Sequence, residues 1–289
     1  MKSVIIPKSN ILGIKRGRPK KIKIEDPFIS KKISLKRQKI LKLKESTHLS
    51  PQIIKGSDLK FNDELFQPIK TNTELDILLS TDGGLMPGTN MVLVGGPGSG
   101  KSTLALDMLS NFTSQGYKCL FISGEMDEIA FYKYCKRLPK FNQIPVLFLK
   151  NYQNNVKEVL EYVFNLGYNV ISIDSLVEVI DMVRDNYKMT EGAAEHWLLG
   201  LQDKNKKGEN LNNLYTAFIN IQQVTKEGEF RGSNRIKHMT DAMAHIGKPN
   251  INAARSIYFS KNRDCDKDFR MNFTINPDSL TYNYENDDE

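Results

Sequence analysis

The chain has 289 residues, of which 39% are hydrophobic and 26% charged, and its formal net charge is +7. That length allows one substantial hydrophobic core with an appended segment, and no apolar run approaches the roughly 18 residues that span a bilayer, so no membrane partner is expected. Three cysteines without CxxC spacing favour neither a disulfide framework nor a zinc site, so a reducing, cytoplasmic setting is expected.

The first part of the chain differs in charge from the remainder. Residues 1–60 contain 17 Lys and Arg against four acidic residues, a net charge of +13, so the remainder carries −6. Dense lysine without steady periodicity predicts a mostly disordered arm over residues 1–56, with one short helix around residues 31–44, and a folded domain over residues 57–289. A basic arm beside a slightly acidic domain favours a polyanionic partner, while composition alone also fits a solvating tail.

From about residue 60, short apolar runs alternate with segments of helical periodicity. Helices are expected directly after residue 100 and over residues 156–163, the second ending at Gly167. The turn Asn276-Pro277-Asp278-Ser279 predicts a closing hairpin. The alternation predicts an α/β fold with a mainly parallel central sheet flanked by helices and a ligand at the carboxyl ends of the strands. Strands are expected at residues 91–94, 119–122 (buried), 146–149 (buried), 170–173, 215–221, 257–259, 271–275 and 280–284.

A glycine-rich segment lies between the first expected strand and the first expected helix. Glycines let main-chain N–H groups turn toward a phosphate without Cβ clashes, and the helix N-terminus that follows favours negative charge. Lys101 is expected to reach the β- and γ-phosphates, and Ser102 to ligate Mg²⁺. We therefore predict that the chain binds and hydrolyses ATP with Mg²⁺. The segment satisfies the phosphate-loop pattern G-x-x-x-x-G-K-[ST] as Gly95-Gly96-Pro97-Gly98-Ser99-Gly100-Lys101-Ser102-Thr103.

Two carboxylates follow other expected strands. Asp174 ends an apolar run and is expected to support the metal ion, as the Asp at the end of a Walker B strand does, although an Asp in this place is also common as a helix cap. Glu125 follows the strand expected beside the phosphate-loop strand, and we expect it to orient or deprotonate the attacking water. Asp127 and Glu128 are rivals for that role, and their alternative role is N-terminal helix charge.

The order of these motifs resembles the RecA-like ATPases, and most closely the RadA/Sms DNA-repair family, over roughly residues 68–275. The resemblance implies a RecA-like P-loop NTPase fold. It starts at residues 71–76 and 83–88, runs through the phosphate loop and includes Ser123-Gly124-Glu125. More specific than the phosphate loop are three later segments: Val224-Thr225-Lys226-Glu227-Gly228, His238-Met239-Thr240-Asp241, and Lys261-Asn262-Arg263, which matches the start of the family's KNRFG motif.

The resemblance also implies roles that spacing alone leaves undefined. Lys261 and Arg263 would contact the γ-phosphate of a neighbouring subunit's nucleotide, which implies a homo-oligomer. Gln222 or Gln223 would sense the γ-phosphate, and which of the two does so stays open. The family's four-cysteine zinc module and Lon-protease-like domain have no counterpart in this sequence. Asp264-Cys265 replaces the Phe-Gly of KNRFG, which puts full branch-migration activity in doubt.

Two regions carry features of nucleic-acid binding. Arg16, Arg18 and Lys20 lie in a Lys-Arg-Gly-Arg-Pro-Lys-Lys segment that resembles an AT-hook for the minor groove of AT-rich duplex. A generic basic tract that binds any phosphate backbone fits the segment equally well. In the folded domain, Met182 to Asn210 is a candidate central loop. A basic, glycine-interrupted loop that enters a helix is a second candidate DNA contact, through Lys226, Arg231, Arg235, Lys237 and His238.

Together these features predict a DNA-dependent ATPase that acts in recombination, repair or replication. It is expected to form a ring, with six subunits as the first candidate, that moves on single-stranded or branched DNA as a helicase or translocase. The alternatives are a DnaB-like helicase, a strand-exchange recombinase filament, and an ATP-gated DNA-binding or scaffold protein that does not translocate. A reduced, Lys- and Asn-rich version of the family would suit a bacteriophage protein acting in the host cytoplasm.

Overall fold

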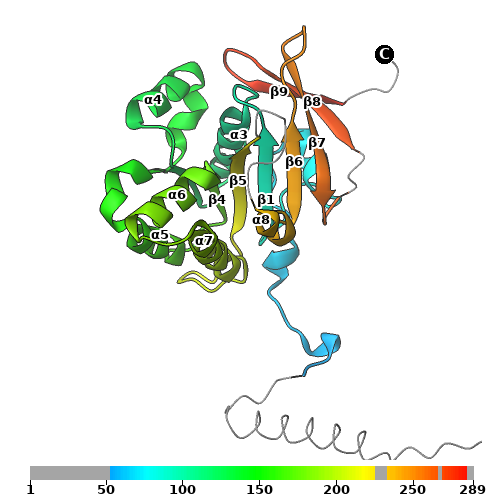
Figure 1. Ribbon diagram of the computed structural model, residues 1–289. Helices are drawn as coiled ribbons and strands as arrows, with labels where there is room; N and C mark the ends of the chain where they lie inside the picture. The colour runs from blue at the N-terminus through cyan, green and yellow to red at the C-terminus, as the bar shows by residue number, and fades with distance from the viewer. Residues whose placement is uncertain (1–52, 225–232, 266–268, 285–289) are drawn as a thin grey trace, which may run out of the picture. The chain divides into compact units, whose positions relative to one another are not determined.

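The computed structural model describes residues 53–224, 233–265 and 269–284 (Figure 1). These residues fall into two units, one that ends at Lys60 and one that spans Phe61–Glu289. In the first unit the described residues form one exposed 3-10 turn, η1 (Gly56–Asp58). The short helix expected around residues 31–44 lies outside the described residues, and the domain boundary at residue 56 stays a prediction.

One sheet of nine strands forms the centre of the described part of the second unit, in the order β3-β2-β4-β5-β1-β6-β7-β8-β9. The pairs from β3 to β6 are parallel, and those from β6 to β9 are antiparallel. This sheet confirms the expected mainly parallel, RecA-like architecture. The strands are β1 (Asn90–Gly95), β2 (Cys119–Ser123), β3 (Val146–Phe148), β4 (Val170–Asp174), β5 (Ala217–Gln223), β6 (Ala242–Ile246), β7 (Ala254–Asn262), β8 (Arg270–Ile275) and β9 (Leu280–Tyr284).

Helices cover both faces of the parallel part of the sheet. They are α2 (Leu75–Leu79), α3 (Lys101–Ser114), α4 (Glu128–Arg137), α5 (Val156–Asn165), α6 (Leu176–Asn186), α7 (Glu191–Lys206) and α8 (Asn234–Met239). Short 3-10 turns connect them at η2 (Asp63–Phe66), η3 (Pro139–Gln143) and η4 (Leu149–Asn155). Among the described residues no helix is both long and apolar enough to cross a membrane.

Two hydrophobic clusters fill the space between the sheet and its helices. Side chains of β1 alternate between them, because successive residues of a strand point to opposite faces. Met91 and Leu93 pack with α2, α3 and α4, whereas Val92 and Val94 pack with α5, α6, α7 and α8. A strand buried on both faces has no polar face, which explains why it reads in the sequence as a continuous apolar run.

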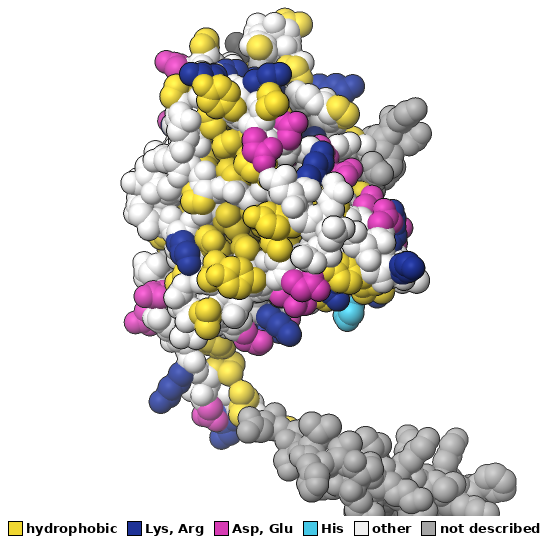
Figure 2. Space-filling view, turned by 90° about the vertical axis from the view of Figure 1, so that its left-hand side faces the viewer, with side chains coloured by type: hydrophobic (Ala, Val, Ile, Leu, Met, Phe, Trp, Pro, Cys, Tyr) yellow, Lys and Arg dark blue, Asp and Glu magenta, His cyan; other side chains and the backbone are white. Residues whose placement is uncertain are grey.

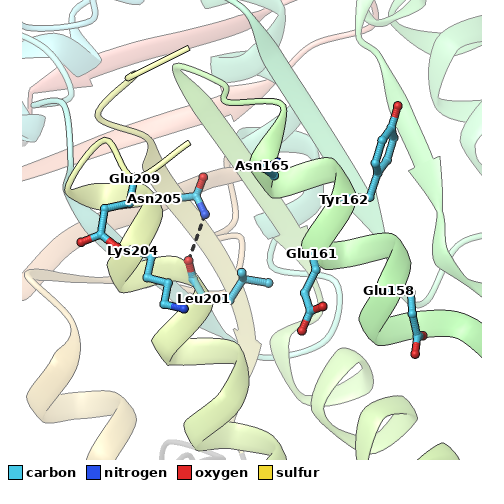
Figure 3. Close-up of a pocket in the computed structure, with 8 residues that line it drawn as sticks. All are labelled: Glu158, Glu161, Tyr162, Asn165, Leu201, Lys204, Asn205 and Glu209. Carbon is cyan, nitrogen blue, oxygen red and sulfur yellow. Dashed lines mark hydrogen bonds between the residues drawn. The ribbon is translucent and has the colours of Figure 1, made fainter. Parts of the chain in front are cut away.

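The outer surface of the helical side is mixed in character. Figure 2 shows hydrophobic side chains interspersed with charged groups of both signs on this face. Tyr162 on α5 is 67% exposed. A groove of about 610 Å³ lies between α5 and α7, and Figure 3 shows Glu158, Glu161 and Tyr162 on one wall and Lys204, Asn205 and Glu209 at the other. It contains none of the residues predicted to bind a nucleotide.

Three expectations about elements were wrong, and one strand, β6, was missed. β2 was expected beside the phosphate-loop strand β1, but β2 pairs with β3 and β4, whereas β1 pairs with β5 and β6. Residues 182–210 do not form a central loop, because Thr190 caps α7 by accepting a hydrogen bond from the Ala193 N–H, and α6 and α7 take up most of the segment. β6 was not expected, since its sequence Ala-Met-Ala-His-Ile lacks the β-branched residues that mark strands. β3 was expected to be buried, but it is the edge strand and is half-buried.

The closing hairpin is confirmed. β8 and β9 pair antiparallel from Met271↔Tyr284 to Ile275↔Leu280, and the Asn276 N–H donates to the Ser279 carbonyl oxygen at 2.9 Å. The core faces of these strands, including Phe273 and Tyr282, join the cluster that contains α3. The end of the described chain therefore packs beside the phosphate-loop helix.

Candidate active site

The phosphate loop connects β1 to α3 at the carboxyl end of the parallel strands. Gly98 and Gly100 have φ angles of +73° and +98°, a backbone conformation that glycine adopts without strain. Gly95 is required for a different reason. A Cβ atom at this position would lie 2.7 Å from the Ser99 Oγ and 2.8 Å from the Ile246 carbonyl oxygen, so no larger residue fits. The glycine pattern therefore produces the expected turn.

Lys101 lies inside this turn. Its Nζ donates hydrogen bonds to the carbonyl oxygens of Gly95 at 2.8 Å and Gly96 at 2.9 Å. Burial lowers the pKa of Lys101, and the carboxylates of Asp174 and Glu125 act in the opposite direction. The ammonium group is thus held where the loop encloses it, with two carboxylates close enough to influence its charge.

Ser102 and Asp174 come together across two elements. The Ser102 Oγ donates to the Asp174 Oδ2 at 2.6 Å, and Asp174 at the end of β4 is only 3% exposed. Burial raises the pKa of Asp174 to about 6; the Ser102 hydrogen bond lowers it, Glu125 raises it and Lys101 lowers it. A hydroxyl and a buried carboxylate are hard oxygen ligands of the kind that Mg²⁺ prefers.

The donor set fits a metal ion that also uses phosphate oxygens. Among the described residues no group of three or more His, Cys, Asp or Glu side chains could enclose a metal. Mg²⁺ is commonly bound through one or two carboxylates together with substrate phosphates and water. Ser102 and Asp174 could therefore hold Mg²⁺ in company with a nucleotide.

Glu125 lies beside this pair at the end of β2. Its Oε1 accepts a hydrogen bond from the Gln223 Nε2 at 3.1 Å, and its main-chain oxygen accepts one from the Lys150 Nζ at 2.6 Å. The N–H groups of Gly124 and Glu125 donate to the carbonyl oxygen of Asp174 at 2.6 and 3.3 Å. The ends of β2, β4 and β5 thus fix the carboxylate near the phosphate loop.

The two rival carboxylates have other partners. Asp127 caps α4 by accepting from the Ala130 N–H at 2.7 Å, and Glu128 accepts from the Asn151 amide at 2.6 Å. That hydrogen bond is the main reason that the pKa of Glu128 is lowered. Both residues occupy the first turn of α4, as a helix N-terminus favours. Glu125 is the carboxylate that faces the phosphate loop.

Gln222 and Gln223 differ in what they contact. Gln223 reaches Glu125, whereas the Gln222 side chain is fully buried and its amide atoms have no hydrogen-bond partner among the described residues. Neighbouring residues of a strand point to opposite faces, so only one of the two can approach the carboxylate. The geometry favours Gln223 for a role at the site.

Lys261 and Arg263 lie near the amino ends of the parallel strands, whereas the phosphate loop lies at their carboxyl ends. Lys261 pairs with Met243 near the start of β6, whereas the phosphate loop begins beside Ile246 at the end of that strand. The Lys261 Nζ donates to the carbonyl oxygens of Lys237 at 3.0 Å and of Thr240, and burial lowers the pKa of Lys261. The structure does not bring these cations to the phosphate loop of their own chain.

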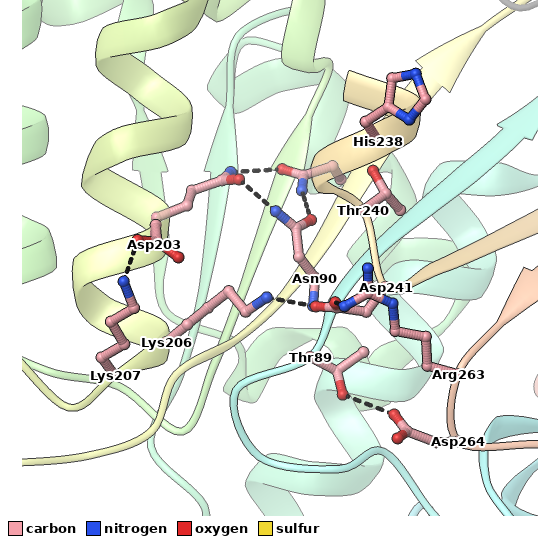
Figure 4. Close-up of polar contacts among 12 residues, drawn as sticks. Thr89, Asn90, Asp203, Lys206, Lys207, His238, Thr240, Asp241, Arg263 and Asp264 are labelled. Carbon is pink, nitrogen blue, oxygen red and sulfur yellow. Dashed lines mark hydrogen bonds and ion pairs between the residues drawn. The ribbon is translucent and has the colours of Figure 1, made fainter. Parts of the chain in front are cut away.

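A polar cluster holds the end of β7 in place (Figure 4). Arg263 pairs with Asp241 at 3.0 Å, and Asp241 also pairs with Lys206. Asp264, which stands where the KNRFG motif has Phe, accepts a hydrogen bond from the Thr89 hydroxyl at 3.2 Å. The substitution therefore ties this segment to the chain just before β1.

The predicted nucleic-acid contacts are only partly described. Arg16, Arg18, Lys20, Lys226 and Arg231 lie outside the described residues. Arg235 and Lys237 are exposed on α8. Ser233 caps that helix by accepting hydrogen bonds from Arg235 and Ile236, and its hydroxyl donates to Glu195 at 2.6 Å.

Two arginines near the phosphate loop were not predicted from the sequence. The Arg137 Nη2 donates to the Thr103 Oγ1 at 3.3 Å. A Cβ atom at Gly100 would lie 3.3 Å from the Cδ and Nε of Arg255. Neither arginine belongs to a motif, and both are distant from the loop in sequence. Only the packing of α4 and β7 brings them to it.

The chain is similar in sequence to a known family of ATPases and to a DNA repair protein. The family model described as "ATPase: KaiC" matches residues 69–282. The DNA repair protein RadA of Campylobacter jejuni subsp. jejuni serotype O:2 is 28% identical over 235 residues, which are 80% of this chain and 50% of that relative. The chain thus spans half the length of this curated relative. The similarity confirms the resemblance to RadA seen in the motifs.

Solved structures share the fold at low sequence identity. The flagellar accessory protein FlaH from Methanocaldococcus jannaschii superposes with a TM-score of 0.55 at 13% identity, covering 76% of this chain and 100% of that chain. The RadB recombinase gives a TM-score of 0.53 at 17% identity, covering 74% and 98%. At these identities the likeness concerns the fold alone.

Proposed function

The chain belongs to the KaiC family of ATPases, and from this we propose that it binds ATP at residues 95–103 and hydrolyses it. The observation that carries the proposal is the convergence of three strand ends on the phosphate loop. Ser102 contacts Asp174 at 2.6 Å, and Glu125 beside them is held by Gln223 at 3.1 Å. Nucleotide-binding sites of open α/β sheets lie at this edge.

Each of these residues has a defined task in the proposed reaction. Ser102 and Asp174 would hold Mg²⁺, which when bound would neutralise phosphate charge. Lys101 exchanges its carbonyl partners for the β- and γ-phosphates. Glu125 accepts a proton from, or orients, the water that attacks the γ-phosphate. Gln223 fixes the carboxylate of Glu125 and senses whether the γ-phosphate is present.

Lys261 and Arg263 would act on a neighbouring subunit. Their place at the opposite end of the sheet from their own phosphate loop supports a role in trans. A cation supplied across an interface stabilises charge in the transition state of phosphoryl transfer. We therefore propose a homo-oligomeric assembly, with a hexameric ring as the first candidate.

DNA is the proposed partner. A relative of this chain is a DNA repair protein, and residues 1–60 carry a net charge of +13. Arg16, Arg18 and Lys20 in the arm, with Lys226, Arg231, Arg235 and Lys237 in the folded domain, are the proposed contacts to phosphates. The activity would serve recombination, repair or replication in the cytoplasm, and helicase or translocase action is its expected form. Bacteriophage origin stays a prediction.

The test measures ATP hydrolysis with and without single-stranded DNA. We expect hydrolysis by the wild type to be stimulated by DNA, and Lys101→Ala and Glu125→Gln to abolish it, with Glu128→Gln as the matched control that retains it. An arm variant with Arg16, Arg18 and Lys20 changed to Gln should keep hydrolysis and DNA stimulation. If this variant loses DNA binding while DNA never stimulates the wild type, the chain is an ATP-gated DNA-binding protein without motor action.

A further inference from the structure

Two guanidinium groups contact the last part of the phosphate loop, at Gly100 and Thr103. Arg137, the last residue of α4, donates to the hydroxyl of Thr103 at 3.3 Å. Arg255, near the start of β7, packs against Gly100, where a Cβ atom would lie 3.3 Å from its Cδ and Nε. Two elements that are far apart in the sequence therefore bring positive charge to the same short stretch of the loop.

Nothing in the described part of the chain neutralises these charges. Neither arginine forms an ion pair there, whereas Arg184 pairs with Asp181 and Asp185 and Arg263 pairs with Asp241. The Arg255 Nε is buried and has no hydrogen-bond partner in the described ranges, and its Nη1 donates only to the Ala253 carbonyl at 2.9 Å. A buried donor left without an acceptor is unfavourable, so this group calls for a partner from outside the chain.

The two guanidinium groups also repel each other. Burial lowers the pKa of Arg255, and the charge of Arg137 lowers it further. Arg137 contacts the ring of Tyr134 at 5.0 Å, a cation–π contact that leaves its charge in place. An anion placed between the two would satisfy the free donor and remove the repulsion.

The position of the pair identifies which part of a nucleotide would supply that anion. Lys101, Ser102, Asp174 and Glu125 gather where the β- and γ-phosphates and Mg²⁺ are expected. Thr103 follows Ser102, so its side of the loop is left for the α-phosphate, which main-chain N–H groups of a phosphate loop also approach. Arginine is suited to this task because its planar fork binds phosphate oxygens in pairs.

We propose that Arg137 and Arg255 clamp the α-phosphate of the bound nucleotide. The inference rests on the proposed function, since it assumes a nucleotide in the phosphate loop. It assigns the two cations to binding, because the α-phosphate is present in ATP and ADP and is not transferred. A Cβ atom at Gly100 would meet the Ile275 Cδ1 at 3.0 Å as well as Arg255, and its φ of +98° also favours glycine.

The test compares nucleotide affinities of the full chain by calorimetry with Mg²⁺. Arg137→Gln and Arg255→Gln should each raise the Kd for ATP and the Kd for ADP by the same factor, about tenfold, as loss of a charged hydrogen bond does. Arg255→Lys, which keeps the charge, should recover part of the loss. Arg270→Gln is the matched control, because Arg270 packs over Tyr258 at 5.0 Å on the same sheet and should bind both nucleotides as the wild type does.

Other outcomes would overturn the inference. Unchanged ADP and ATP affinities in both variants would show that the cations do not contact the nucleotide. A loss for ATP alone would place them at the γ-phosphate instead. Because Arg137 is exposed, Arg137→Gln decides the question even if Arg255→Gln unfolds in a thermal melt. Failure of the wild type to bind either nucleotide, or wild-type binding by Lys101→Ala, would reject the proposed function itself.

Discussion

At the scale of single residues, the effect of replacing a glycine depends on the atoms that surround it. Gly95 is enclosed by the Ser99 hydroxyl and the Ile246 carbonyl, so its lack of a side chain is a steric requirement. Gly200, inside α7, has nothing within 4 Å of where a Cβ atom would be, and there glycine only adds freedom to the unfolded chain. The same residue type is thus essential in the loop and dispensable in the helix.

We predict opposite effects of alanine at these two positions. Gly95→Ala should lower the free energy of unfolding by about 1–3 kcal/mol, as overpacking does, because one of the contacting atoms is main chain and cannot rotate away. Gly200→Ala should raise it by about 0.5–1 kcal/mol. Urea denaturation of both variants checks this, and equal changes in the same direction would contradict the prediction.

His245 makes the stability of the folded chain depend on pH. Its Nε2 lies 2.7 Å from the Ser260 Oγ, its ring stacks on Tyr258, and burial followed by the charge of Lys237 lowers its pKa. The unfolded state therefore binds the proton more readily than the folded state, with an ordinary pKa of 6.5. The contribution of His245 to stability is present above pH 6.5 and is lost as the pH falls below it.

We expect His245→Gln to flatten the acid limb of the stability curve. Thermal melts between pH 5 and 8 should show the wild type losing more stability than the variant below pH 6.5. His196→Gln is the control, because this residue also lies in the folded unit. Parallel pH profiles for the wild type and His245→Gln would contradict the assignment.

At the scale of elements, the C-terminal hairpin is attached to the phosphate-loop helix by a buried polar contact. The Tyr282 hydroxyl on β9 donates to the Asp107 Oδ2 on α3 at 2.9 Å, and Lys140 pairs with the other carboxylate oxygen at 2.5 Å. Burial and the neighbouring Asp107 both raise the pKa of Tyr282. The contact links the last described strand to the helix that begins at Lys101.

Removal of this hydroxyl should weaken the attachment. Tyr282→Phe should lower the free energy of unfolding by about 1–3 kcal/mol, because Asp107 keeps its burial but loses one hydrogen-bond donor. Tyr284→Phe, two residues further along β9 and 44% exposed, is the matched control and should change stability by less than about 0.5 kcal/mol. Chemical denaturation compares the two, and equal effects would argue against a structural role for the Asp107 contact.

At the scale of the whole molecule, the catalytic candidates are divided between the two ends of the sheet. The phosphate loop, Glu125 and Asp174 lie at the carboxyl ends of the parallel strands, and Lys261 and Arg263 lie near the start of β6. In the isolated chain Lys261 is held by carbonyl oxygens around the end of α8, and Arg263 by Asp241. A complete site on the proposed plan needs two copies of the chain.

This division predicts complementation between two inactive variants. Lys101→Ala lacks a working phosphate loop, and the double variant Lys261→Ala, Arg263→Ala lacks the cations proposed to act in trans. Each alone should have little ATPase activity, whereas their mixture should recover a part of it, since some interfaces then combine the intact halves. Measurement of hydrolysis across mixing ratios checks this. Activity that never exceeds the sum of the separate variants would reject action in trans.

The sequence by itself determined the features that depend on local chemistry. The glycine pattern from Gly95 to Gly100 predicts the turn, because only glycine tolerates the positive φ angles and the close contacts found there. Continuous apolar runs predict the buried parallel strands, and the carboxylates that follow them, Asp174 and Glu125, meet at one edge because parallel strands end together. The turn at Asn276 predicts the hairpin in the same way.

Only the tertiary structure decided which long-range partners each side chain has. Residues 182–210 form helices because their apolar side chains pack into the cluster with β1 and β4, a contact that local composition does not reveal. β6 becomes a strand because it is enclosed between β1 and β7. Arg137 and Arg255 reach the phosphate loop through the packing of α4 and β7, so neither motif nor spacing predicts them. Contacts between distant segments depend on how complete elements pack, and that information is spread over the entire core.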